Sequence, residues 1–231
     1  MIKSTFQSLT HLFYPHLCIG CGSDLLAPKA LLCLTCVTEL PHTGFETYPH
    51  NPIERIFYGR LVLQYAHAGF YFSKGTLIQT LIHDFKYKGN KAVGILLSKI
   101  MAEKMMNSDR FKHIDYLIPL PLFADKEYKR GFNQAKIICD GISEVMNIPV
   151  LAHTVLRKYA TTTQTKKHRT ERWQNVAESF TVQHTQQLQH KHILLVDDVI
   201  TTGATIEACT QQMAGLAGIK ISVATLATAT N

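Results

Sequence analysis

Strand-like and helix-like segments alternate regularly along the second half of the chain. Strands are expected at 114–120, 150–156, 192–197 and 219–226, and helices near 132–146 and 203–216. This alternation is typical of a parallel β-sheet with helices packed on its faces. Such sheets bind ligands at the carboxyl ends of their strands. The sequence therefore predicts an α/β protein with a ligand site at that edge of the sheet.

The first half of the chain is less regular. Residues 61–73 are expected to form one or two strands, arranged as a hairpin if there are two. Apolar residues recur at helical spacing in 77–85 and 93–101, and residues 1–17 have the pattern of a short amphipathic helix. No apolar run approaches the roughly 18 residues of a membrane helix. The first residues also lack the long apolar stretch of a signal peptide, so a cytoplasmic protein is expected.

Two adjacent acids and a threonine-rich turn follow the third predicted strand of this half. Ile193 to Val196 form a continuous apolar run, as in a strand that is buried on both faces. Asp197 and Asp198 come next. The turn that opens the following helix consists of Thr201, Thr202, Gly203, Ala204 and Thr205. This order places two carboxylates beside the beginning of a helix.

A helix N-terminus attracts phosphate because its first amides are free and its dipole is positive there. Gly203 allows a close approach of the backbone, and the threonine hydroxyls add donors. The Gly-x-x-x-x-Gly-Lys-Ser/Thr loop and the Gly-x-Gly-x-x-Gly fingerprint of nucleotide sites are both absent. A phosphate-binding turn preceded by two acids suits a sugar phosphate. The alternative is an ordinary strand–turn–helix unit with threonine caps.

Four of the six cysteines are clustered near the N-terminus. Cys18 and Cys21 form one Cys-x2-Cys pair, and Cys33 and Cys36 form another after eleven residues. Two such pairs can converge on one tetrahedral centre, and four sulfur ligands are typical of a structural zinc site. We therefore predict a bound zinc that stabilises this segment. Two disulfides or an iron–sulfur cluster are the alternatives.

The positive charge of the chain is unevenly distributed. The formal net charge is +7, and the segment 157–172 contributes five of these charges. Its basic residues are Arg157, Lys158, Lys166, Lys167, Arg169 and Arg172. A local basic segment indicates an anionic partner, either a phosphate-rich small molecule or a nucleic acid. The alternative is a solvated loop.

The segment with the acid pair and the threonine turn resembles the signature of type I phosphoribosyltransferases that binds phosphoribosyl pyrophosphate (PRPP). In that family the two acids bind the ribose 2′- and 3′-hydroxyls, and the threonine turn binds the 5′-phosphate. The resemblance implies the first role for Asp197 and Asp198, and the second for the residues from Thr201 to Thr205. It also implies a magnesium ion that bridges pyrophosphate and ribose oxygens.

Together, the cysteine pairs and the PRPP-like motif resemble the ComF family, which is associated with bacterial competence. The resemblance covers nearly the whole chain. It implies a cysteine zinc module in 1–45, a variable region or hood in 46–112 and a phosphoribosyltransferase-like core in 113–231. Proteins of this family are linked to the inward movement of single-stranded DNA, with a helicase as the expected partner.

Three further segments are similar to this family. Arg130, Asn133 and Gln134 stand where these transferases have their pyrophosphate loop, so Arg130 and Gln134 are implied ligands of PRPP. Helix capping is the alternative for the amides. The pattern around Gln164 matches the segment that closes over PRPP, except that Lys167 replaces an apolar residue. Lys86 and Tyr87 are candidates for contact with an acceptor, or they simply end a helix before Gly89.

The resemblance thus implies transfer of a phosphoribosyl group from PRPP to a nitrogen acceptor, with Asp197, Asp198 and Arg130 at the reacting centre. No side chain acts as nucleophile in this chemistry, so positioning and electrostatics carry the catalysis. A regulator that binds PRPP without turnover is one alternative. An adaptor that handles single-stranded DNA is another.

Overall fold

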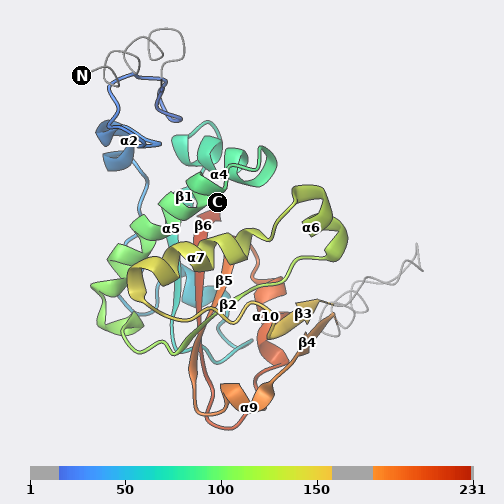
Figure 1. Ribbon diagram of the computed structural model, residues 1–231. Helices are drawn as coiled ribbons and strands as arrows, with labels where there is room; N and C mark the ends of the chain where they lie inside the picture. The colour runs from blue at the N-terminus through green and yellow to red at the C-terminus, as the bar shows by residue number, and fades with distance from the viewer. Residues whose placement is uncertain (1–15, 158–178, 230–231) are drawn as a thin grey trace.

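The computed structural model describes residues 16–157 and 179–229 of the chain, and Figure 1 shows how its elements are arranged. The helices are α2 (Leu34–Thr38), α3 (Pro52–Ile56), α4 (Leu77–Tyr87), α5 (Lys91–Met106), the short 3-10 helix η1 (Asp109–Phe111), α6 (Ala124–Arg130), α7 (Gln134–Met146), α9 (Thr185–Leu188) and α10 (Ala204–Gln211). The strands are β1 (Ala66–Phe72), β2 (Tyr116–Pro119), β3 (Val155–Arg157), β4 (Phe180–Val182), β5 (His192–Ile200) and β6 (Lys220–Ala229).

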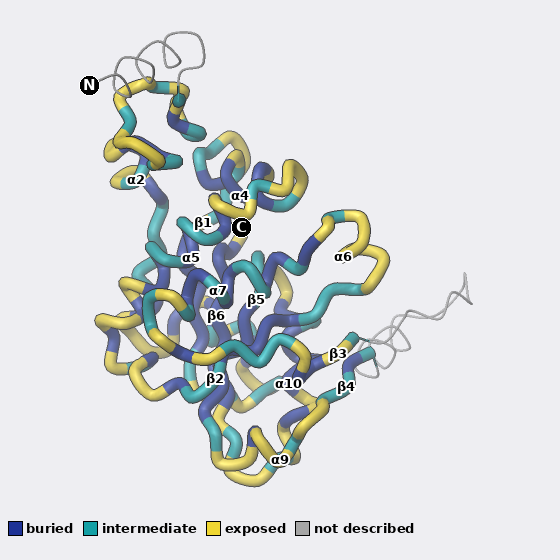
Figure 2. Tube along the Cα trace, in the orientation of Figure 1, coloured by how far each residue is buried: buried dark blue, intermediate teal, exposed yellow. Residues whose placement is uncertain are grey.

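A four-stranded parallel sheet in the order β1-β6-β5-β2 forms the centre of the molecule. The inner strand β6 is buried except at its two ends, and β5 is buried from His192 to Val196, as the dark colour in Figure 2 shows. Their apolar runs explain this position, because a strand that is covered on both faces has no polar side to expose. The predicted α/β architecture is confirmed.

Helices cover both faces of the sheet (Figure 1). Helices α4, α5 and α7 lie over one face, where their apolar residues form a cluster with alternate residues of the strands, such as Leu194 and Val196. Helices α3 and α10 pack on the opposite face against Ile193 and Leu195. The period of two in a strand accounts for this division. In the part of the chain that the structure describes, no helix has the length and apolar character needed to cross a membrane.

The structure decides between two alternatives for one segment and corrects the expectation for another. Of the one or two strands expected in 61–73, the structure has the single strand β1, which pairs in parallel with β6 and is not part of a hairpin. The segment 150–156 is only briefly part of the parallel sheet, through a bridge between Val150 and Leu117. The chain then leaves the sheet, and β3 pairs antiparallel with β4. The helix expected at 1–17 lies almost wholly outside the described residues.

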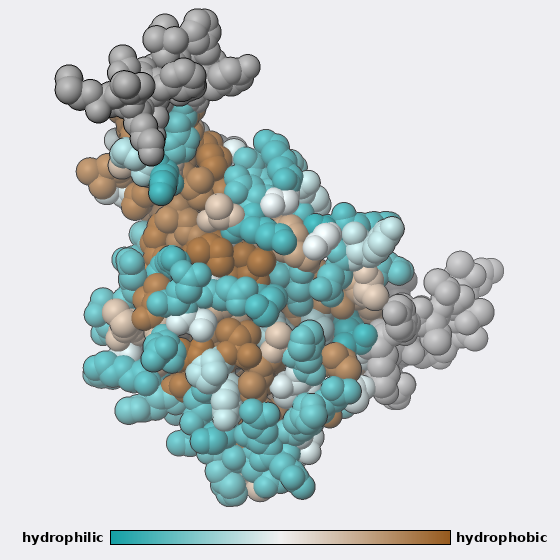
Figure 3. Space-filling model, in the orientation of Figure 1, coloured by the Kyte–Doolittle hydropathy of each residue, from teal (hydrophilic) through white to brown (hydrophobic). Residues whose placement is uncertain are grey.

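The cysteine-containing segment packs directly on the helical layer. Cys18, Cys33 and Cys36 belong to the same apolar cluster as Ile78 and Leu81 of α4. On the face drawn in Figure 3, apolar surface gathers where this segment meets the helices below it. The segment is therefore attached to the core through α4 and α5.

Candidate functional site

The acid pair lies near the carboxyl end of β5, at the edge where the sheet was expected to bind a ligand. The strand continues to Ile200 and thus includes both Asp197 and Asp198. Because successive side chains of a strand point to opposite faces, the two carboxylates separate. Asp197 lines a pocket with the threonine turn. Asp198 instead forms an ion pair with Lys86, at 2.7 Å between Oδ2 and Nζ.

The pocket encloses about 250 Å³ of space that includes open solvent. Its lining consists of Asp197, Val199, Ile200, Thr201, Thr202, Gly203, Ala204, Thr205 and Ile206. All five residues of the turn therefore surround the same space as one carboxylate. The size and the polar lining suit a small polar group such as a phosphate with its neighbouring hydroxyls.

The beginning of α10 supplies the donors of this pocket. Gly203 is the N-cap residue, and no side chain caps the helix there. The first amides of a helix have no partner within the helix, and the dipole gives this end a partial positive charge. Gly203 has φ +71°, a left-handed conformation that glycine adopts without strain. The turn thus leaves an uncapped helix N-terminus open to an anion.

Residues from outside the motif hold this turn in place. The guanidinium of Arg60 donates to the carbonyl of Thr202 at 3.0 Å and forms an ion pair with the buried Glu207 of α10. The ring of Phe57 packs so closely on Gly203 that a Cβ there would lie 2.7 Å from Cε1 of Phe57. The segment between α3 and β1 therefore packs against the turn and supports it. No sequence motif indicated this contact.

The ionisation of Asp197 is shifted toward neutrality. Burial, and then the negative charge of Asp198 beside it, raise the pKa of Asp197 to about 7. Both effects disfavour the charged carboxylate. Asp197 therefore changes its protonation state in the neutral range, which gives the pocket a dependence on pH.

Arg130 and Gln134 lie on the side of Asp198. Arg130 donates from Nη1 to Oε1 of Gln134 at 2.7 Å, and the same nitrogen lies 3.9 Å from Oδ2 of Asp198. Asn133 follows the capping alternative, because its side chain accepts from the N–H of Ala135 at the start of α7. The structure thus brings Arg130, Gln134 and the acid pair together.

Arg157 begins the basic segment and is its one described residue. Its guanidinium lies between the rings of Phe123 and Phe180, at 3.6 and 4.9 Å from the two ring centroids. Its positive charge acts on Asp197. This stacking fixes the base of the β3–β4 hairpin beside the pocket. The rest of the segment, including Gln164, Lys166, Lys167, Arg169 and Arg172, lies outside the described residues.

The four clustered cysteines converge on one point. Their sulfur atoms all lie within 4.8 Å of one another, and no disulfide joins any of the six cysteines of the chain. The 3.7 Å between the sulfurs of Cys21 and Cys33 is far longer than a disulfide bond. The predicted disulfide alternative is therefore not adopted.

The chemistry of this cluster fits a metal. The N–H of Cys33 donates to the sulfur of Cys18 at 3.2 Å. Burial acts to raise the pKa of Cys18, but hydrogen bonds from the backbone of Cys21, Cys33 and Gly20 lower it to about 6. A thiolate held by amides is the ligand form of cysteine. Four cysteine sulfurs that converge on one point match the ligand set of a closed structural zinc site.

Magnesium fits the acid pair less well. Asp198 has both oxygens engaged, since Oδ1 accepts from the N–H of Val199 at 2.5 Å and Oδ2 pairs with Lys86. A divalent cation at this carboxylate has to displace an ammonium group. Direct coordination of a divalent cation by Asp198 is therefore not favoured, whereas the magnesium that the resemblance implies between pyrophosphate and ribose oxygens stays a prediction.

No protein-family model matches the chain, but individual proteins do. Competence protein F of Haemophilus influenzae is 27% identical over 94% of this chain and 99% of its own length. DNA utilization protein YhgH of Shigella flexneri is 28% identical over 58% of this chain, and the match spans 60% of that relative. Among solved structures, the glutamine PRPP amidotransferase from B. subtilis has a TM-score of 0.42 and 16% identity, over 58% of this chain and 26% of that one.

The fold and the site define an α/β protein with a parallel sheet, a pocket at the N-terminus of α10 and a four-cysteine cluster at the N-terminal side. The chain is a homologue of competence protein F, and the ComF-family resemblance of its motifs is confirmed.

Proposed function

We propose that the pocket beside α10 binds PRPP. The observation that carries this proposal is the uncapped N-terminus of α10, surrounded by the threonine turn and Asp197. The amides of the turn donate hydrogen bonds to the 5′-phosphate, and the ionised carboxylate of Asp197 accepts a hydrogen bond from a ribose hydroxyl. Arg130, on the other side of β5, donates to the pyrophosphate oxygens.

The reaction that this arrangement supports is phosphoribosyl transfer. The lone pair of a nitrogen acceptor forms a bond to C1 of the ribose, while the bond from C1 to the pyrophosphate oxygen breaks. The electron pair leaves with pyrophosphate, and the acceptor nitrogen loses a proton to solvent. Because charge separates in this step, fixed donors at both ends of the ligand lower the barrier. An assay that offers a panel of nitrogen bases as acceptors and measures the release of pyrophosphate separates an enzyme from a protein that only binds PRPP.

PRPP binding is expected to strengthen with pH. A ribose hydroxyl needs an ionised acceptor, and a carboxyl group whose pKa is about 7 goes from mostly protonated at pH 6 to mostly ionised at pH 8. This change strengthens binding about tenfold. Isothermal titration calorimetry with PRPP, in the presence of magnesium, measures the affinity across this range.

Asp197→Asn is the matched control, because it keeps the shape and cannot ionise. The ligand phosphate also titrates near pH 6, but it does so equally for both proteins. The ratio of the wild-type PRPP affinity to that of Asp197→Asn is therefore expected to rise about tenfold from pH 6 to pH 8. Absence of PRPP binding to the wild-type protein over the whole range would falsify the proposed function.

A role with DNA is a second candidate, and the names of the relatives favour it. One is a competence protein and the other a DNA utilization protein. We propose that this chain acts in the uptake or use of DNA, with single-stranded DNA and a competence helicase as candidate partners. If the chain binds DNA itself, its affinity for a single-stranded oligonucleotide falls steeply as salt is raised. A shift assay at two salt concentrations tests this, and unchanged mobility at low salt argues against direct contact.

A further inference from the structure

Lys86 reaches the acid pair from a helix outside the core strands. It lies near the end of α4, which follows β1, whereas Asp198 lies on β5. The side chains of the two residues are only 14% and 16% exposed, and their charged atoms are 2.7 Å apart. At this depth, removing one partner leaves a buried charge uncompensated, which costs more than breaking a pair on an open surface.

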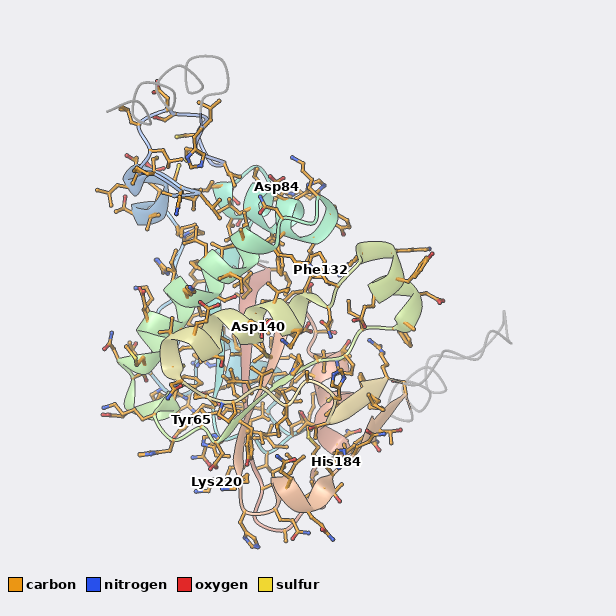
Figure 4. The ribbon with its side chains drawn as sticks, in the orientation of Figure 1. Tyr65, Asp84, Phe132, Asp140, His184 and Lys220 are labelled. Carbon is orange, nitrogen blue, oxygen red and sulfur yellow. The ribbon has the colours of Figure 1, made fainter. Side chains whose placement is uncertain are left out.

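The packing of α4 fixes Lys86 in this position. Its neighbour Phe85 is fully buried and contacts the ring of Phe132, with 5.7 Å between the ring centroids. Figure 4 labels Phe132 between α4 and α7. On its other side, Phe85 lies against Gly94 of α5 so closely that a Cβ there would come within 2.4 Å of the ring. The main chain that carries Lys86 is therefore held between α5 and the turn that precedes α7.

Lys86 supplies the charge that directly compensates Asp198. Two neighbouring carboxylates lie beside a turn that is built for an anion, and like charges at such distances repel. Arg130 faces the same oxygen of Asp198, but at 3.9 Å, and its Nη1 already donates to Gln134. Lys86 is the cation in direct contact with the carboxylate among the described residues.

We propose that the ammonium of Lys86 is the resident counter-cation of the acid pair, in the place at Asp198 that a divalent cation would otherwise take. An anionic sugar phosphate then binds at this edge of the sheet without magnesium. Lys86 acts here through Asp198 and is a positioning residue. The inference rests on the proposed PRPP site and names the cation that makes this site compatible with an anion.

The test measures PRPP affinity by calorimetry with and without millimolar magnesium. Magnesium is omitted rather than chelated, so that a metal on the cysteines stays bound. We expect the affinity of the wild-type protein to change less than about threefold between the two conditions. Without magnesium, Lys86→Met should bind about 30-fold more weakly, because Asp198 then adds an uncompensated negative charge close to the anion site. Added magnesium should restore most of this loss.

Two further variants separate charge from packing. Lys86→Arg keeps the cation and should bind PRPP without magnesium. Lys88→Met removes the same charge two residues later, from an exposed side chain that pairs with Asp84, and should behave like the wild type. An equal loss of PRPP affinity in Lys86→Met with and without magnesium indicates a purely structural role and overturns the inference.

The wild-type measurement alone is also decisive, even if Lys86→Met does not fold. If magnesium raises the PRPP affinity of the wild-type protein by tenfold or more, the inference is overturned and the proposed PRPP site stands. Absence of binding in both conditions overturns the proposed function and the inference with it. Binding of similar strength in both conditions supports the counter-cation.

Discussion

Replacing Cys36 with alanine is expected to remove a bound zinc and to lower the melting temperature of the protein by about 10 °C. Cys36 is buried in the same apolar cluster as the residues of α4, so loss of the metal loosens a part of the core as well as the cysteine segment. At roughly 2–4 °C for each kcal/mol in a chain of this size, the shift corresponds to about 3–5 kcal/mol. Elemental analysis and thermal unfolding measure the two effects.

Cys139→Ala is the control for this experiment. Cys139 is also buried, but it lies on α7 outside the cluster of four sulfurs. Its replacement costs some packing, about 1 kcal/mol, and should leave one zinc for each chain. Equal metal content in the Cys36→Ala protein and the wild type would show that the cluster is not the metal site.

Gly203→Ala is expected to have the largest effect on ligand binding. The residue has φ +71°, and the added methyl group would meet Phe57 at 2.7 Å and Ile56 at 3.0 Å. Strain and overlap together destabilise the protein by about 2–3 kcal/mol. The turn has to move to relieve them, and its amides then no longer converge on the phosphate. We expect PRPP affinity to fall by about 100-fold or more, since several charge-assisted hydrogen bonds are lost together.

Gly215→Ala is the matched control, because a Cβ at this position meets no atom within 4 Å. Its melting temperature and its PRPP affinity should be close to those of the wild type. Calorimetric titration and urea unfolding of both variants give the comparison. A Gly203→Ala protein that binds PRPP normally would mean that the ligand does not use this turn.

The features predicted well from the sequence are those that depend on local order. The apolar run from Ile193 to Val196 indicates a buried strand wherever it lies, because no polar face is available. The acid pair, the turn and the helix are contiguous, so their common place at the end of β5 follows from chain order alone. The two Cys-x2-Cys pairs converge for a similar reason, since each pair is short and tightly turned.

The features that were missed depend on contacts between distant segments. Arg60 lies 142 residues before Thr202, whose carbonyl it binds, and nothing in its own neighbourhood marks it. Residues 61–73 were compatible with a hairpin because the pattern of a strand does not name its partner, which is β6. Lys86 was noted as a candidate for contact with an acceptor or as part of a helix end, but its pairing with Asp198 depends on how α4 lies on the sheet.

Asp197 and Asp198 show how the fold refines a motif. The sequence assigns both acids the same role, whereas the pleat of β5 turns them to opposite sides. One faces the pocket and the other faces two basic side chains. The alternation of side chains along a strand predicts that the two acids point to opposite faces, but only once β5 is known to extend to Ile200.

Helix α4 spans the distance between the two chemical centres of the molecule. At its first residue, Leu77 lies against the cysteine segment, where a Cβ on Gly20 would approach it to 2.7 Å. Near its last residue, Lys86 contacts Asp198. A rigid helix of this length carries a shift at one end to the other. We therefore expect preparations that differ in zinc occupancy to differ in sugar-phosphate affinity, so metal content has to be matched before any two affinities are compared.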